Sequence, residues 1–287
     1  MQGIRLCLGT SGSYGASDKE QIKIFHKVGF DAFFLNWSRE LNIKMLKEYG
    51  EGLGMTLQSV HAPFGKAARM WEPREQAQAA IDELLDCLQD CSDNDVPIMV
   101  CHAFIGFDKH EPNEHGIKNY GVVVEAAKEY GVKIAFENTE GEEYLAALMN
   151  AFQNETCVGF CWDTGHEMCY NRSQDMMALY GDRLIATHLN DNLGIKDYAG
   201  EKITFLDDLH LLPFDGIADW EDITDRLNAY GYDGILTFEL NKRSKPDRYD
   251  NDIYASMLLE QYVTEAYKRA CRVAALKLRN MKNKDKM

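Results

Sequence analysis

The sequence of 287 residues lacks any apolar run that approaches the roughly 20 residues of a membrane-spanning helix. Residues 1–10 hold only a short apolar stretch and no small-residue cleavage site, so we expect no signal peptide. None of the eight cysteines belongs to a Cys-x-x-Cys pair. We therefore expect a cytoplasmic protein that keeps its cysteines reduced and has no membrane partner.

Positive charge is also scarce. The chain has 31 Lys and Arg residues against 46 Asp and Glu residues, and its formal net charge is -15 at pH 7. This charge repels phosphate backbones, so a nucleic-acid partner is disfavoured, although a local basic patch could overcome the total. Small neutral ligands, and ligands bound with the help of a cation, are favoured instead. The oligomeric state is left open, a homo-oligomer included.

Low-complexity linkers are absent, and 45% of the residues are apolar, which is ample for a hydrophobic core. Barrels of about 250 residues fold as single units. We therefore expect one domain over residues 1–287, in which the Lys-rich residues 279–287 form a frayed tail.

Strand-like and helix-like segments alternate along the chain. Short apolar segments predict eight strands, at residues 5–9, 32–35, 56–60, 98–101, 133–136, 158–162, 184–187 and 234–238. Helices are predicted at residues 18–28, 43–49, 74–91, 120–130, 142–152, 173–179, 220–230 and 252–278. Eight strand-then-helix units predict a closed (β/α)8 TIM barrel, because an open doubly wound sheet needs fewer strands and a reversal of order. Residues 192–219 are expected to form a long loop at the functional site.

Acidic and histidine side chains stand where these apolar segments end. Four of them, at the ends of the fifth to eighth predicted strands, are Glu137, Asp163, His188 and Glu239. Such groups are costly to dehydrate at the mouth of a buried strand unless they are paired or bind a metal. Because parallel strands of a barrel end at one rim, we expect the four to share a divalent cation. Three carboxylates and one imidazole suit manganese, magnesium or cobalt, and zinc is also compatible.

A second group of potential ligands surrounds the first. Its members are His61, His102, His166, Asp208 and His210. The first two end the third and fourth predicted strands, and the last two form an Asp-x-His pair in the long loop. Each one alone is as compatible with a capping or hydrogen-bonded core residue as with a ligand. Together they could hold a second or third cation, or bind substrate hydroxyls.

Aromatic side chains also occur near the predicted strand ends. They are Trp37, Phe64, Phe104 and Phe107. They could form an apolar wall for a sugar ring, or they could simply pack the top of the barrel.

Four segments resemble the xylose-isomerase-like barrel superfamily. They are Phe136-Glu137-Asn138-Thr139, Asp163-Thr164-Gly165-His166, His188-Leu189-Asn190-Asp191-Asn192 and Phe238-Glu239-Leu240. The superfamily includes sugar-phosphate isomerases and epimerases, ketose 3-epimerases, inosose dehydratases and apurinic-site endonucleases with three zinc ions. The resemblance covers nearly the whole chain, and its motifs are specific for the superfamily but weak for any one member.

The resemblance implies that the four strand-end residues hold the shared metal, and that Glu137 and Glu239 act as acid and base in the epimerases. It also implies that the five surrounding residues complete a three-metal cluster in the endonucleases. The acidic chain and the segment Ala62-Pro63-Phe64-Gly65 are more like the sugar isomerases. Gly194 stands where ketose 3-epimerases usually place an Arg, which counts against that one activity.

We therefore expect a metal-dependent isomerase or epimerase that acts on a sugar, a sugar phosphate or a polyol. The cation would acidify the C–H beside a carbonyl and stabilise the enediolate, while a carboxylate moves the proton. The alternatives are a phosphodiesterase of the apurinic-site endonuclease type with three zinc ions, an inosose dehydratase-like lyase, and a barrel that binds sugars or partners without catalysis.

Overall fold

The computed structural model describes residues 3–108, 111–195 and 202–284. Its eight strands form one sheet in the order β7-β6-β5-β4-β3-β2-β1-β8, and neighbouring strands are parallel. The strands are β1 (Leu6–Gly9), β2 (Ala32–Asn36), β3 (Thr56–His61), β4 (Ile98–His102), β5 (Lys133–Glu137), β6 (Val158–Asp163), β7 (Leu184–His188) and β8 (Leu236–Phe238). All eight predicted strands are confirmed, with bounds that shift by one or two residues.

The sheet closes into a barrel between β7 and β8. Leu189, directly after β7, forms a parallel bridge with Phe238. The Leu189 N–H donates to the Thr237 carbonyl at 2.8 Å, and the Glu239 N–H donates to the Leu189 carbonyl at 3.3 Å. This seam is short, since β4 and β5 pair over five residues each. The predicted (β/α)8 TIM barrel is thus confirmed.

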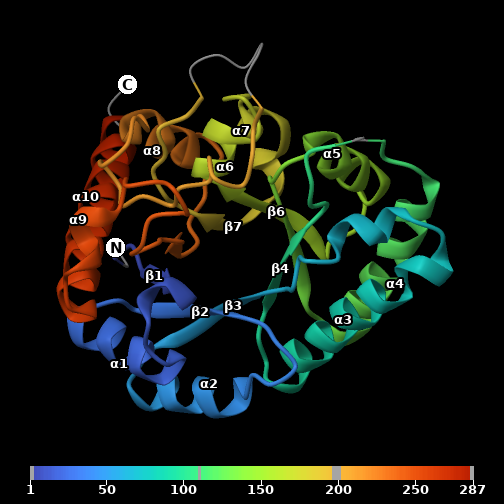
Figure 1. Ribbon diagram of the computed structural model, residues 1–287, viewed down its shortest axis with the longest axis horizontal. Helices are drawn as coiled ribbons and strands as arrows, with labels where there is room; N and C mark the ends of the chain where they lie inside the picture. The colour runs from blue at the N-terminus through green and yellow to red at the C-terminus, as the bar shows by residue number, and fades with distance from the viewer. Residues whose placement is uncertain (1–2, 109–110, 196–201, 285–287) are drawn as a thin grey trace.

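The helices lie around the outside of the barrel (Figure 1). They are α1 (Asp18–Val28), α2 (Ile43–Gly52), α3 (Arg74–Asp93), α4 (Glu114–Tyr130), α5 (Glu142–Ala151), α6 (Thr164–Cys169), α7 (Met176–Tyr180), α8 (Trp220–Ala229), α9 (Asp252–Ala255) and α10 (Leu259–Lys284). Because helices cover one face of each strand and side chains fill the barrel on the other, strands such as β6 are buried along their whole length.

Local sequence signals explain several of these bounds. Ser17 and Glu20 form a capping box that begins α1. Gly29 and Gly131 follow α1 and α4 with φ angles of 121° and 70°, a backbone conformation that L-residues with a side chain rarely adopt. These two glycines therefore end their helices and turn the chain into the next strand.

The helix predicted at residues 173–179 is partly wrong. The structure has two short helices in this region, α6 and α7, of which α6 follows β6 without a loop. Asp163 makes this possible, because its Oδ1 accepts a hydrogen bond from the His166 N–H at 2.7 Å and so caps α6. A residue predicted as a ligand thus also begins a helix.

The predicted terminal helix and tail also differ from the structure. Residues 252–278 form two helices instead of one, and the side chain of Gln261 accepts a hydrogen bond from the Leu258 N–H at 2.9 Å at the start of α10. The chain stays helical to Lys284 rather than fraying from residue 279. Asn280 explains the extension, because its Nδ2 donates to Thr224 Oγ1 of α8 at 3.1 Å. Residues 285–287 lie outside the described residues.

The barrel interior is packed rather than hollow. Val100, Ala135, Cys161 and Ala186, from four neighbouring strands, form one buried cluster inside it. All eight cysteines lie in the described parts of the chain and are unpaired. In those parts, we find no helix with the length and apolarity that a membrane crossing requires.

Candidate metal centre

The four strand-end residues meet at the carboxyl rim of the barrel. Glu137, Asp163 and His188 are the last residues of β5, β6 and β7, and Glu239 directly follows β8. One ligand atom from each lies within 4.8 Å of the others. His188 Nδ1 is 3.0 Å from Glu137 Oε1 and 3.0 Å from Glu239 Oε2. We call these four residues the primary set.

Two further sets adjoin the primary set. His61 and His102 share Glu137 with it, since their Nε2 atoms lie 3.2 Å and 3.3 Å from Glu137 Oε2. Asp208 lies between two histidines, because its Oδ1 is 3.4 Å from His166 Nε2 and 2.8 Å from His210 Nε2. The structure therefore brings all nine predicted site residues together, in three of the four groups of potential ligand atoms among the described residues. The fourth group joins Glu137 and His188 to the buried Cys161, which was not predicted as a ligand.

Three of the histidines are oriented by backbone carbonyls. The Nδ1 atoms of His61, His166 and His210 lie 2.8 Å, 3.0 Å and 3.2 Å from the carbonyl oxygens of residues 62, 138 and 239. A carbonyl can only accept, so each Nδ1 carries a hydrogen and donates it. In the neutral ring, Nε2 then presents a lone pair toward the carboxylates. Imidazole lone pairs and carboxylate oxygens that face one another, with this outer support, form a donor set that fits a divalent cation.

The charges of these residues shift one another's pKa values. Burial by itself would lower the pKa of His210, but Asp208 and Glu239 outweigh it and raise that pKa to about 9. Burial would raise the pKa of Glu239, but His188 and His210 outweigh it and lower that pKa to about 2. For Asp163, burial dominates and raises the pKa to about 6. At pH 7 the metal-free protein therefore holds a proton on His210 and none on Glu239.

The stability of the metal-free protein is expected to fall between pH 6.5 and about pH 9. The pKa of His210 is higher in the folded protein than in the unfolded chain, so its protonation stabilises the fold at a pH below the unfolded value. This contribution is lost as the pH rises through the folded value. A bound cation takes the place of the proton, so metal-loaded protein should not show the loss. Thermal denaturation across this pH range measures the stability of the metal-free protein when a chelator is present and of the metal-loaded protein when zinc is present. The metal-free fall should be less steep in His210→Asn, where His166 and His188, whose pKa values nearby carboxylates also raise, keep contributing. An equally steep fall in that variant would contradict the assignment.

Two asparagines that sequence reasoning missed hold Asp163 in place. Asn190 Nδ2 donates to Asp163 Oδ2 at 2.8 Å, and Asn138 Oδ1 accepts a hydrogen bond from the Asp163 N–H at 2.8 Å. Each asparagine lies one or two residues after a ligand, in the segments that carry the family resemblance. Their position close to the predicted ligands is the sequence signal that could have identified them.

Asp191 fixes the loop that carries Asp208 and His210. Its fully buried carboxylate accepts hydrogen bonds from the N–H groups of residues 192, 214 and 218 and from Trp220 Nε1, at 2.9, 2.8, 3.0 and 2.9 Å. Lys245, after β8, also supports this loop, because its Nζ lies 3.1 Å from Asp208 Oδ2. Neither residue was predicted.

A model of the family described as xylose isomerase-like TIM barrel matches residues 22–258. The chain belongs to this family. The resemblance inferred from the four sequence segments is thus confirmed. The matched region ends beyond the eighth strand, so it includes all nine residues of the centre.

Relatives and solved structures extend this result. The uncharacterised protein y4fM of Sinorhizobium fredii is 35% identical over 152 residues, which cover 50% of this chain and 45% of that protein. An inosose dehydratase of Lactiplantibacillus plantarum is 28% identical over 165 residues, 52% of this chain and 53% of that enzyme. The chain thus matches about half the length of these two relatives.

Among solved structures, an IOLI protein with a bound zinc atom has a TM-score of 0.74 at 18% identity, over 95% of this chain and 98% of that chain. An L-ribulose 3-epimerase has a TM-score of 0.72 at 14% identity, over 98% of this chain and 97% of that chain. At these identities the likeness shows the fold alone.

Proposed function

We propose that this protein is a divalent-metal-dependent isomerase or epimerase of a sugar or polyol, with its catalytic ion held by the primary set. The observation that carries the proposal is the convergence of three carboxylates and one imidazole within 4.8 Å at the rim of a xylose isomerase-like barrel. A bound divalent cation would polarise a substrate carbonyl and acidify the adjoining C–H. Manganese, magnesium, cobalt or zinc fits the donor set.

Glu239 is suited to be the base. It is the most accessible ligand of the primary set, with 25% of its side chain exposed, whereas Glu137 is fully buried. Its lowered pKa keeps it deprotonated at neutral pH but also weakens it as a base. Glu239 would therefore need a C–H that the bound cation has made more acidic. Glu137 is the second candidate for proton transfer. If the two glutamates face opposite sides of the same carbon, the product is an epimer, and if one face is used, it is an aldose–ketose isomer.

The activities of two similar proteins support a sugar or polyol substrate. One relative is an inosose dehydratase and one structural neighbour is an L-ribulose 3-epimerase. The zinc atom of the IOLI structure supports metal binding in this fold. A dehydratase activity would use the same proton abstraction but would release water, so product analysis separates a lyase from an isomerase.

Metal analysis followed by deuterium exchange tests the proposal. The purified chain, reloaded with each of the four metals, should retain at least one ion per chain. Incubation in D2O with a panel of ketoses, aldoses and inososes should place deuterium on the carbon beside the carbonyl of one of them, as seen by NMR. Failure to retain metal after reloading would remove the proposal, and retained metal without exchange or turnover would indicate a barrel that only binds.

A second candidate function is phosphodiester hydrolysis, and the two additional ligand sets favour it. Three adjacent ions could stabilise both the attacking and the leaving oxygen of a phosphate ester. Counting the ions separates the candidates, because one ion at the primary set supports isomerase chemistry and three support hydrolysis. Incubation of the zinc-loaded protein with an abasic DNA duplex tests the second directly, and the absence of incision would exclude it.

A further inference from the structure

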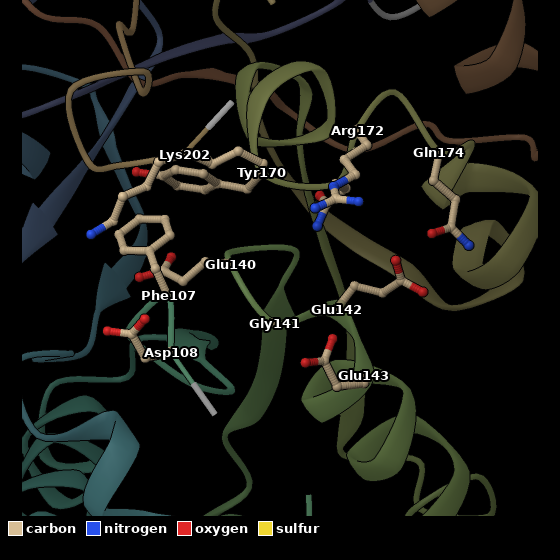
Figure 2. Close-up of a pocket in the computed structure, with 12 residues that line it drawn as sticks. Phe107, Asp108, Glu140, Gly141, Glu142, Glu143, Tyr170, Arg172, Gln174 and Lys202 are labelled. Carbon is tan, nitrogen blue, oxygen red and sulfur yellow. The ribbon is translucent and has the colours of Figure 1, made fainter. Parts of the chain in front are cut away.

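A cavity of about 690 Å³ lies beside the metal centre. Its walls come from the segments that follow β4, β5, β6 and β7, and they include Phe107, Glu140 and Tyr170 (Figure 2). The Tyr170 ring stacks on the ring of His166, with centroids 5.0 Å apart and planes 26° apart. One aromatic ring therefore separates this cavity, which we call the Glu140 cavity, from a predicted metal ligand.

One end of the cavity has an aromatic wall. The rings of Phe107 and Tyr170 have centroids 5.6 Å apart and meet edge to face at 62°. In Figure 2 both rings lie at the same end, next to Glu140. Aromatic faces with a few well-placed polar groups are the usual lining of small-molecule sites. The apolar C–H face of a sugar ring fits such a wall.

Glu140 provides the polar group. Glu140 is only 8% exposed, and its Oε1 accepts a hydrogen bond from the Gly106 N–H at 3.0 Å. No donor from the described residues forms a hydrogen bond with its second oxygen. This oxygen is open to solvent on the cavity side, so it can accept a hydrogen bond from a donor in the cavity. Ligand hydroxyl groups that enter the cavity could supply that donor.

The charge of the lining selects against anions. Four carboxylates line the cavity, those of Asp108, Glu140, Glu142 and Glu143, against the two cations of Arg172 and Lys202. A cleft with an excess of one sign repels ligands of the same sign. A phosphorylated ligand is therefore disfavoured here, and an uncharged ligand rich in hydroxyl groups is favoured. The volume of the cavity also falls in the range of typical small-molecule sites, about 300–1,000 Å³.

We propose that the Glu140 cavity is a subsite for a second, uncharged glycosyl unit. The substrate would then be a neutral glycoside or disaccharide, with one ring in this cavity and the other at the metal centre. The identity of the reacting ring rests on the proposed function, whereas the binding of the remote ring does not. Hydroxyls of the remote ring donate to Glu140, and its C–H face lies against Phe107 and Tyr170.

Calorimetric titration of the metal-loaded protein tests the subsite. The probes are cellobiose, maltose, trehalose and sucrose, compared with glucose and glucose 6-phosphate. We expect at least one disaccharide to bind about tenfold more tightly than glucose, a difference of about 1.4 kcal/mol. The phosphate group should give no gain. Equal affinities for disaccharides and glucose, a preference for the phosphate, or no sugar binding at millimolar concentration would each overturn the proposal.

Variants locate the binding. Glu140→Gln keeps an oxygen for the Gly106 N–H but removes the charge, and Phe107→Leu removes the aromatic face. Both should abolish the advantage of the disaccharide over glucose without changing the metal content. Glu48→Gln, the same chemical change at an exposed position of α2, should keep the wild-type preference. An unchanged preference in Glu140→Gln would contradict the subsite.

The outcomes also separate this subsite from the proposed function. Disaccharide binding that depends on Glu140, without any isomerase turnover, would contradict only the proposed function. Turnover of monosaccharides without any disaccharide preference would contradict only the subsite.

Discussion

Glu137→Gln is expected to lose metal and turnover together. Glu137 belongs both to the primary set and to the set of His61 and His102, with Oε1 3.0 Å from His188 Nδ1 and Oε2 3.2 Å from His61 Nε2. Glutamine has one side-chain oxygen and no charge. One set therefore loses its oxygen ligand, and both sets lose the negative charge that balances the cation. If Glu137 also transfers a proton, kcat/KM should fall by about 10²- to 10⁴-fold or more. Mass-spectrometric metal analysis and steady-state kinetics measure the two effects.

Glu167→Gln is the matched control for this variant. Glu167 is also buried and lies next to His166, but its carboxylate faces Arg226 at 2.7 Å and Trp162 Nε1 at 2.8 Å. Loss of this carboxylate should lower the melting temperature and leave the metal content unchanged, because Glu167 forms a salt bridge with Arg226 and is not a ligand of the centre. Full metal content in Glu137→Gln, or loss of metal in Glu167→Gln, would contradict the assignment of the ligands.

Asp191→Ala is expected to cause the largest loss of stability. The substitution leaves four donors without an acceptor, two of them buried and two partly buried. By analogy with broken buried charge networks, this costs about 3–5 kcal/mol of unfolding free energy. The affected donors hold the loop that presents Asp208 and His210. The variant should therefore also lose any ion bound with His166, while the primary set keeps its own. Urea denaturation and metal counting test the two parts.

Asp219→Ala provides the comparison. Asp219 is exposed and caps α8, where its Oδ1 accepts hydrogen bonds from the N–H groups of Glu221 and Asp222, both at 3.1 Å. Loss of such a cap costs about 1 kcal/mol. Its metal content should equal that of the wild type. Equal losses of stability in Asp219→Ala and Asp191→Ala would show that Asp191 does not organise the loop.

The barrel could be predicted because its strands carry their own signal. A short apolar run that ends in an acid or a histidine, as at Glu137 or His188, marks both a buried strand and the place where it reaches the rim. Since all parallel strands end at the same rim, the primary set followed from topology without any knowledge of distances. The family resemblance then supplied the ligand roles of the remaining five residues, and those roles stay predictions.

The supporting residues could not be predicted in the same way. Asp191 bonds to groups up to 29 residues further along the chain, and nothing in the local sequence records such contacts. Asn190 looks like an ordinary loop residue until its amide is seen to donate to Asp163. Helix α6 was missed because Asp163 serves two purposes, and a five- or six-residue helix has little periodicity to detect.

The short junction between β7 and β8 gives the primary set a mechanical role. His188 and Glu239 stand on the two sides of this junction, 3.0 Å apart at their nearest side-chain atoms. An ion that both of them hold would join β7 and β8, the two ends of the strand order, where few backbone hydrogen bonds do so. Closure of the barrel and catalytic activity would then depend on the same pair of side chains.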